Sequence, residues 1–452
     1  MHILKGYTKQ EISWMMYDWA NSAHSVIIVT LLPIFFDTVA GYTADSVSSM
    51  STWGYATSIA MLIVALAAPF LGVFGDIRGM RKKLFSFFML LGVAACAGMA
   101  FTPGMDFTSG PVAAGKVASL ILVLYIVSVI GFDASAIYYD AFLTDVTIED
   151  RMDKVSTMGY GLGYIGGSTI PLLIFLIMNL VGVPMLTCLA FVFGLTAVWW
   201  LAFSLPLLKN CEQTSGKPYE KGDVARSIKG VGTTIKEIIA NKPMLIYILS
   251  YFFYIDGVHT VISMATTYGT NLGLDSTGMM LALLLVQILG LPFCLLYIKC
   301  SEKFGARTMV GFGICVYMFI CIFAFFMNSL WQFWVLAVLC ATSQGGIQAL
   351  SRSMYGKLIP DKDRSGEFFG FFDIFGKFSS IMGPALVGVV SSVVANGMLG
   401  AQGLTAQTAT AEQIDAINAQ SSHYGILSII IIIIVGAVLY FGFLPKAEHA
   451  KR

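Results

Sequence analysis

The sequence predicts an all-α polytopic membrane protein, with twelve transmembrane helices in two pseudo-symmetric six-helix bundles. Composition is the first of three observations behind this prediction: of 452 residues, 57% are hydrophobic and only 12% are charged. Soluble domains carry about 45–50% apolar and about 25% charged residues. Charges this sparse cannot cover a water-soluble surface, which excludes a soluble enzyme, a nucleic-acid-binding protein and a disordered scaffold. The net charge of +1 gives no attraction to nucleic acid.

The second observation is a series of apolar stretches, each long enough for the roughly 20 residues that a membrane span needs. Helices are expected because backbone polar groups in lipid must be paired within their own segment. The first stretch begins near Ile12 and is longer than the apolar part of a signal peptide, so it is predicted to be a retained span. In chain order, the predicted spans are residues 12–36, 49–73, 83–102, 117–142, 155–180, 184–206, 243–270, 276–298, 307–328, 330–354, 367–395 and 423–444.

Basic residues orient these spans. Of the 27 Lys and Arg residues, 25 fall on one side of the predicted membrane; Lys116 lies on the other side and Lys377 lies within a span. Cytoplasmic loops carry the excess of Lys and Arg in membrane proteins, so both termini are predicted to be cytoplasmic. The compact loops favour the cytoplasmic membrane of a bacterium.

The longest cytoplasmic connection, residues 207–242, divides the chain into an N-terminal bundle, 1–206, and a C-terminal bundle, 243–452. Apolar residues at helical spacing predict an amphipathic helix within it: Val224, Ile228, Val231, Ile235 and Ile238. That helix lies either on the inner membrane surface or against the bundle. Residues 397–422 are polar, contain no Lys or Arg, and are predicted to form an external loop.

The third observation is an internal repeat. Residues 21–27 (NSAHSVI) in span one match residues 256–262 (DGVHTVI) in span seven. Residues 75–81 (GDIRGMR), after span two, match residues 301–307 (SEKFGAR), after span eight. Two matches in the same order on either side of the central connection predict two related halves.

Several motifs resemble those of a known transporter family. Residues 72–83 read GVFGDIRGMRKK, which resembles the loop motif between spans two and three of the major facilitator superfamily. The signature of its vacuolar-effluxer-like (autophagy-related 22-like) branch resembles YDWANSA at residues 17–23. Further likenesses to that branch lie at residues 139–143 (YDAFL), 345–353 (GGIQALSRS) and 367–371 (EFFGF).

This resemblance implies a secondary transporter in which two six-helix bundles rock around a central site. Fungal members are associated with amino-acid export from the vacuole, whereas most bacterial members have no assigned substrate. His24 departs from the family pattern, where an aromatic or other residue is more common.

For the loop motif, the resemblance implies that Asp76, Arg78 and Arg81 hold the cytoplasmic side closed through charge pairs. The alternative is that the basic residues there serve only as a topology signal.

Polar residues within spans one and seven are candidates for a solute site, because a charge at mid-membrane costs at least about 2.5–3.5 kcal/mol. Asp18 and Asn21 share a face of span one, and His24 lies on an adjoining face. Asp256 and His259 repeat this pattern in span seven. These residues either line a cavity for a polar solute, with Asp256 or His259 coupling a proton, or make fixed hydrogen bonds between helices.

Spans four and five carry further candidates. Asp133 and Asp140 share a face of span four; Asp133 is a candidate for binding solute or a proton. Asp140 lies near the cytoplasmic end, where a gating or capping role is expected. Gly159, Gly163 and Gly167 recur every four residues in span five, which predicts close backbone approach, either for sliding bundles or for static packing.

Spans ten and eleven complete the candidates. Gln344, Gln348 and Arg352 step by four along span ten. Arg352 either snorkels to the inner surface or binds a substrate carboxylate. Lys377 either pairs with Asp373, four residues earlier in its helix, or binds the solute.

The predicted function is secondary active transport. No Walker motif, HExxH motif or Cys/His ligand cluster occurs, so no metal, cofactor or enzymatic activity is predicted. The expected cargo is a small polar solute, an amino acid or related metabolite, moved by alternating access with proton coupling through a monomer in the lipid bilayer. Export of apolar drugs or lipids is the alternative within transport. A non-transporting membrane receptor or intramembrane enzyme is the alternative from another class.

Overall fold

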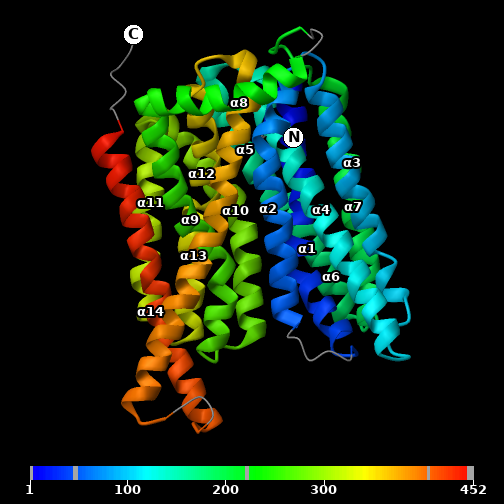
Figure 1. Cartoon of the computed structure of the whole chain (residues 1–452), viewed down its shortest axis with the longest axis vertical. Helices are drawn as coiled ribbons and strands as arrows, with labels where there is room; N and C mark the ends of the chain where they lie inside the picture. The colour runs from blue at the N-terminus through cyan, green and yellow to red at the C-terminus, as the bar shows by residue number, and fades with distance from the viewer. Residues whose placement is uncertain (1–3, 44–48, 219–222, 405–407, 445–452) are drawn as a thin grey trace. The chain divides into compact units, whose positions relative to one another are not determined.

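The computed structural model describes residues 4–43, 49–218, 223–404 and 408–444. These residues form fourteen α-helices with short 3₁₀ and π segments between or after some of them (Figure 1). Within the described part of the chain, twelve helical segments are long and apolar enough to cross a membrane. The predicted fold class and the number of spans are therefore confirmed.

The residues divide into two compact units. Unit 1 holds Met1–Gly232 and Gly356–Ile374, and unit 2 holds Thr233–Tyr355 and Phe375–Arg452. The segment 356–374 therefore groups with the first seven helices, although it lies far from them in the sequence. The predicted division of the chain at residues 207–242 stays a prediction.

Unit 1 contains the first six spans, and each begins and ends within a few residues of its predicted range. Span five consists of two α-helices joined by a π-helical segment, η4 (Tyr164–Thr169). The first helix begins where it does because Thr8 and Glu11 form a capping box, each side chain accepting the other's backbone N–H. The helices are α1 (Lys9–Ala40), α2 (Ser49–Gly75), α3 (Arg81–Met99), α4 (Pro111–Val146), α5 (Met152–Gly163), α6 (Ile170–Leu180) and α7 (Met185–Asn210).

Aromatic residues around the YDWANSA signature fasten α1 to its neighbours. The Trp14 indole stacks on Tyr139 of α4 with ring centroids 4.4 Å apart, and its N–H donates to the Tyr139 carbonyl at 2.8 Å. The Tyr17 hydroxyl lies 2.7 Å from that of Ser135, also on α4. On the other side, Trp199 of α7 donates to the carbonyl of Trp19 at 3.1 Å. The signature and the residues beside it thus pack α1 against α4 and α7 in the core of unit 1.

The glycines of span five face α1. A Cβ added to Gly163 would lie 2.5 Å from the Ser22 hydroxyl, and one added to Gly167 would lie 2.6 Å from the Trp19 carbonyl oxygen. Gly159 is similarly tight against the Asp18 carboxylate. The close backbone approach predicted from their spacing therefore occurs between two helices of the same unit.

A methyl group at Gly167 is expected to destabilise the protein. The Cβ of Gly167→Ala would meet the backbone of α1, which cannot move aside as a flexible side chain can, so we expect a loss of about 1–3 kcal/mol. Gly115→Ala in α4 is the matched control, because a Cβ there meets nothing within 4 Å. Thermal unfolding of both purified variants checks this; equal melting temperatures would contradict it.

Unit 2 contains the other six spans. Its helices are α9 (Lys242–Asn271), α10 (Ser276–Phe304), α11 (Ala306–Phe325), α12 (Leu330–Leu358), α13 (Ser365–Ala401) and α14 (Ala411–Val438), with α13 entering from unit 1. Buried hydroxyl groups join the helices of this unit. Tyr254 of α9 lies 2.7 Å from the Ser351 hydroxyl of α12, and Ser250 of α9 donates to the Gly436 carbonyl of α14 at 2.9 Å.

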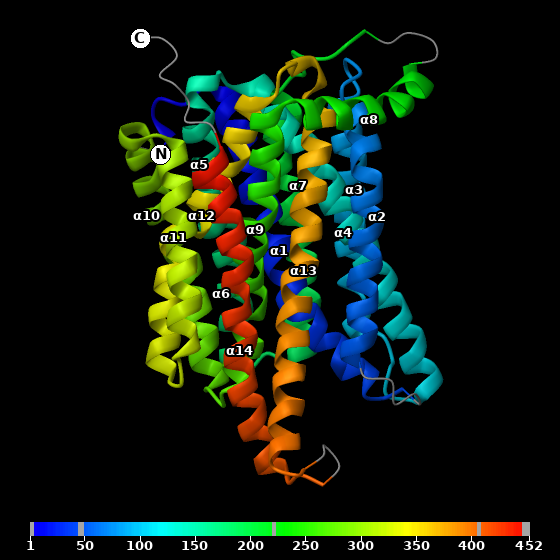
Figure 2. The same ribbon diagram turned by 60° about the vertical axis from the view of Figure 1, so that its left-hand side comes forward.

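One connection differs from its prediction. Residues 397–422 were expected to form a loop, but α13 continues to Ala401 and α14 begins at Ala411, so most of this range is helical. Thr410 caps α14 through a capping box with Gln413. The two helix ends extend beyond the neighbouring ends of α10 and α11 (Figures 1 and 2). A polar composition without a long apolar run concealed this helical extension.

The helix predicted in the central connection is present as α8 (Asp223–Ala240). Among its described side chains, Thr234 and Ile238 are buried, whereas Ile235 and Ile239 are exposed. Its apolar surface is therefore covered only in part. Which surface covers the rest of α8, protein or membrane, stays a prediction.

Candidate functional site

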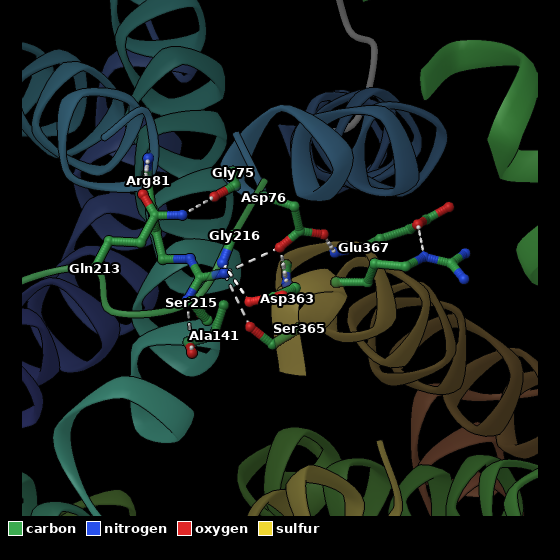
Figure 3. A network of polar contacts seen from close by, with 12 residues as sticks. Gly75, Asp76, Arg81, Ala141, Gln213, Ser215, Gly216, Asp363, Ser365 and Glu367 are labelled. Carbon is green, nitrogen blue, oxygen red and sulfur yellow. Dashed lines mark hydrogen bonds and ion pairs between the residues drawn. The ribbon is translucent and has the colours of Figure 1, made fainter. Parts of the chain in front are cut away.

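A buried charge network lies at the loop between α2 and α3 (Figure 3). Arg81 is fully buried; its Nη2 donates to Asp76 Oδ1 at 2.9 Å, and its Nη1 donates to the carboxylate of Asp145. The Ala141 carbonyl and the Ser215 hydroxyl each accept from Nη1 at 3.2 Å. One planar guanidinium thus joins this loop to the end of α4 and to the connection after α7.

Asp76 also joins the loop to the first turn of α13. Its Oδ1 accepts the Gly366 N–H at 2.7 Å and its Oδ2 accepts the Glu367 N–H at 2.8 Å. N–H groups in a first helical turn have no acceptor within the helix, and the helix dipole there favours a negative charge. Arg81 donates as well to the Ser365 hydroxyl at 2.9 Å. We call this group the Arg81 cluster: Asp76, Arg81, Asp145, Ser215, Ser365, Gly366 and Glu367.

Three glycines allow α13 to approach α2 beside this cluster. A Cβ on Gly366 would lie 2.5 Å from the Gly72 carbonyl oxygen, and one on Gly370 would lie 2.5 Å from the carbonyl oxygen of Ala68. A Cβ on Gly72 would overlap the backbone of Gly366. Side chains at these positions would separate the helices and withdraw the first turn of α13 from Asp76.

The first residues of the central connection, after α7, also contact the α2–α3 loop. Gln213 accepts the Gly79 N–H at 2.9 Å and donates to the Gly75 carbonyl at 2.9 Å. Lys217 pairs its backbone with the strand-like turn at Asp76 and Arg78, with both hydrogen bonds at 2.9 Å. The α2–α3 loop is therefore held in a fixed shape by backbone contacts.

An ion pair and a hydrogen bond tie the segment 356–374 to the rest of unit 1 at further points. Lys357, at the end of α12, lies 2.7 Å from the Asp153 carboxylate at the start of α5. The Gly216 N–H donates to Asp363 at 2.8 Å. Separating this segment from unit 1 would break these contacts together with those of the Arg81 cluster.

Two predicted gating residues, Asp76 and Arg81, are thus brought together, whereas Arg78 is exposed and Asp140 is half-buried on α4. Their role as a gate stays a prediction. Sequence reasoning missed Asp145, Gln213 and the contacts of residues 365–367, although EFFGF at residues 367–371 was among the family likenesses. A motif states which residues recur, but it does not show which helix end a carboxylate reaches.

Acid pH is expected to favour the contact between Asp76 and α13. Burial raises the pKa of Asp76 to about 7, although Arg81 and the two N–H groups of α13 act in the opposite direction. A solvated aspartate has a pKa of about 3.9, so the joined arrangement binds a proton that the separated one releases. By linkage, lowering the pH through 7 stabilises the joined arrangement.

Spin labels at the exposed residues Arg78 and Lys362 measure this effect. Between about pH 8 and about pH 5, the short-distance population should grow as the pH falls. Asp76→Asn should remove that dependence, because it has no carboxyl group to titrate. A pH response that persists in Asp76→Asn would show that another group titrates.

The solute-binding candidates in the spans of unit 1 are all buried. Asp18 and Asn21 are each 8% exposed. His24 lies 3.2 Å from the Ser128 hydroxyl and stacks on Phe132 at 4.7 Å. Asp133 is 2% exposed on α4. His24 thus contacts α4 of its own unit, and all four residues are less exposed than the half-buried His259, Gln348 and Lys377 of unit 2.

In unit 2, three helices bring candidates together. Asp256 Oδ1 accepts the Gly383 N–H of α13 at 2.9 Å and lies 3.3 Å from the Thr260 hydroxyl. Its Oδ2 is buried and has no hydrogen-bond partner among the described residues. Pro384 follows Gly383 and lacks an N–H, so Asp256 binds α13 where its hydrogen-bond ladder is interrupted.

One turn further along α9, His259 lies among polar groups from α12 and α13. Its Nδ1 is 3.5 Å from the Ser379 hydroxyl. The Gln348 amide is close enough to its ring for a hydrogen bond, and the Lys377 ammonium is close enough for an electrostatic interaction. His259, Gln348 and Lys377 are half-buried, so part of each side chain is accessible. We call His259, Gln348, Lys377 and Ser379 the His259 cluster. The sequence marked three of them separately but did not place them together.

The two remaining candidates, Arg352 and Gln344, have different surroundings. Arg352 is buried on α12, 4% exposed. Gln344 is half-buried and lines an apolar cavity of unit 2 together with Gln287. A role for either in solute binding stays a prediction.

Comparison with known proteins assigns the family. The model of a family described as vacuole effluxer Atg22 like matches residues 7–397. The uncharacterized MFS-type transporter YxiO of Bacillus subtilis (strain 168) is 40% identical over 452 residues, covering 98% of this chain and 96% of that protein. Autophagy-related protein 22-1 of Penicillium rubens is 25% identical over 274 residues, 55% of this chain and 46% of that protein.

Solved structures agree on the fold. The major facilitator superfamily proton:xylose symporter XylE, bound to 6-bromo-6-deoxy-D-glucose, superposes with a TM-score of 0.71 at 15% identity, covering 97% of this chain and 96% of that chain. A bacterial homologue of the iron transporter ferroportin gives a TM-score of 0.62 at 15% identity, covering 95% and 98%. The chain is thus a transporter of the major facilitator superfamily and belongs to its vacuole effluxer Atg22-like family.

Proposed function

We propose that this transporter is a proton-coupled carrier of an amino acid or a related small polar metabolite, working by alternating access. The observation that carries the proposal is the His259 cluster, which places an ammonium, an imidazole, an amide and a hydroxyl together on three membrane helices. An amino acid offers a carboxylate that Lys377 and Gln348 could bind. Charged and polar groups at this depth are costly, which supports a functional role for them.

The proton is assigned to Asp256 within this proposal. Its carboxyl group lies one turn from His259 on α9, and its Oδ2 is buried without a hydrogen-bond partner among the described residues. A carboxylate in such a place is costly unless it is protonated or paired. Binding and release of a proton there would accompany movement of the solute.

Alternating access is assigned to the Arg81 cluster. The cluster joins the first turn of α13 to the α2–α3 loop, while α13 belongs to unit 2 from Phe375 onward. Making and breaking these contacts would change the position of α13, and with it Lys377 and Ser379. The continuous helix α13 would thus couple the α2–α3 loop to the His259 cluster.

Location and assembly complete the proposal. The 25 basic residues on one side support cytoplasmic termini and insertion in the cytoplasmic membrane. One chain contains both halves of six spans each, which supports function as a monomer. The absence of sequence motifs for nucleotide or metal chemistry supports a carrier without enzymatic activity.

Flux in proteoliposomes tests the proposal. Purified protein is reconstituted and offered a panel of labelled amino acids, sugars, nucleosides and apolar dyes, with and without a pH gradient. We expect gradient-dependent movement of at least one amino acid or related metabolite, lost in Lys377→Met. Movement of apolar dyes alone would favour export of apolar compounds instead, and binding without flux would favour a receptor.

A further inference from the structure

A partly open cavity lies within unit 2, and none of the residues of the His259 cluster lines it. It has a volume of about 90 Å³ and is bordered by α9, α10, α11, α12 and the start of the apolar run in α14. Its wall is mainly aliphatic and aromatic, with Val286, Ile320, Phe333 and Ala337 among its residues. An apolar cavity of this kind binds apolar molecules when its volume allows; about 150 Å³ suffices for benzene.

The wall of this cavity carries an unsatisfied amide. Gln287 lines the cavity, and its Oε1 is buried without a hydrogen-bond partner among the described residues. A second amide, that of Gln344, also lies in the wall. The Tyr268 hydroxyl, by contrast, already lies 2.6 Å from both the Ala324 carbonyl and His423 Nδ1. The two amides are therefore the polar groups that a bound molecule could use.

We infer that this cavity binds a small lipophilic molecule that carries one hydroxyl group. Leaving a buried amide oxygen unpaired is costly, so a donor that reaches it gains affinity. A hydroxyl both donates and accepts, so it can pair with the Gln287 amide in either orientation of its terminal group. The volume fits a short alkyl group with its hydroxyl, and any longer chain must leave through the opening.

The alternative occupant is a plain hydrocarbon, which would gain nothing from Gln287. Two photoreactive probes separate these possibilities: a short diazirine alkanol and a diazirine alkane of the same length. Both are added to the full-length protein in lipid vesicles, and the labelled residues are mapped by mass spectrometry. We expect the alkanol to label the cavity wall more strongly, and an unlabelled alkanol to compete for that labelling.

Three variants complete the test. Gln287→Leu should lower labelling by the alkanol about fivefold, the loss of one hydrogen bond, and leave labelling by the alkane unchanged. Ala337→Phe should fill the cavity and abolish labelling by both probes, whereas Val338→Phe, at a neighbouring exposed position, should not.

The outcomes are decisive without any assay of transport. Equal labelling by both probes that is insensitive to Gln287→Leu would overturn the hydroxyl specificity. Labelling that avoids the cavity wall in the wild-type protein would overturn the site itself. Because the wild-type competition uses no variant, a misfolded variant cannot hide either result.

Discussion

Arg81→Ala is expected to cost about 3–5 kcal/mol of stability, because it leaves buried carboxylates without their cation. The Arg81 guanidinium is fully buried. Within the described structure it donates hydrogen bonds to Asp76, Asp145, Ser215, Ser365 and the Ala141 carbonyl. Water cannot readily replace it, since the side chain of Asp145 is also fully buried. Thermal or chemical unfolding of the purified protein measures this loss.

The pattern of substitutions distinguishes a buried network from an ordinary surface charge. Arg78→Ala removes an exposed arginine from the same loop, and its effect should stay within about 0.5 kcal/mol. Arg81→Lys should fall between the two, since a lysine ammonium has three donors and cannot span the acceptors that a planar guanidinium reaches. Equal effects of Arg78→Ala and Arg81→Ala would show that the network contributes no stability.

A compensated variant tests the electrostatic cause directly. Arg81→Met combined with Asp76→Asn and Asp145→Asn leaves no unpaired charge in the cluster, so it should be more stable than Arg81→Ala alone. It should nevertheless hold the first turn of α13 less firmly, because the asparagine at position 76 has one acceptor oxygen for the two N–H groups of Gly366 and Glu367, and the methionine at position 81 cannot donate to the Ser365 hydroxyl. Spin labels at Arg78 and Lys362 should then report a larger population of long distances.

The sequence predicted the fold well because membrane helices obey a strong constraint. Twelve apolar runs of sufficient length admit few structures other than helices, and all twelve are found among the described residues. The error at residues 397–422 arose where that constraint ends. Outside the apolar layer, helices end through capping and local propensity, and the box formed by Thr410 and Gln413 is a weak signal within a polar sequence.

The site was predicted less completely, for a different reason. The sequence singled out His259, Gln348 and Lys377 because polar residues in apolar runs are conspicuous. Their meeting depends on how α9, α12 and α13 are rotated about their axes, which no single helix specifies. The Arg81 cluster shows the same limit: Asp145 and the N–H groups of residues 366 and 367 carry much of it, and backbone groups leave no trace in a sequence.

Asp256→Asn is expected to abolish solute accumulation driven by a pH gradient, reducing it to the level of empty liposomes. Asparagine keeps the shape of the side chain, and its carbonyl oxygen can still accept the Gly383 N–H, now at 2.9 Å from Asp256 Oδ1. The substitution therefore removes the titratable group and preserves the link between α9 and α13. Exchange of labelled for unlabelled solute across the membrane needs no net proton movement, so it should persist.

Thr260→Val is the matched control for this prediction. It removes the hydroxyl 3.3 Å from Asp256 Oδ1 but keeps the carboxyl group and the side-chain volume, so accumulation should be retained. Loss of both exchange and accumulation in Asp256→Asn would point to a structural role at the interrupted part of α13. Accumulation that survives in Asp256→Asn would contradict the assignment and transfer the proton to another buried carboxyl group, with Asp133 on α4 the next to test. Because exchange and accumulation are measured in the same vesicles, coupling is separated from folding by the ratio of the two rates.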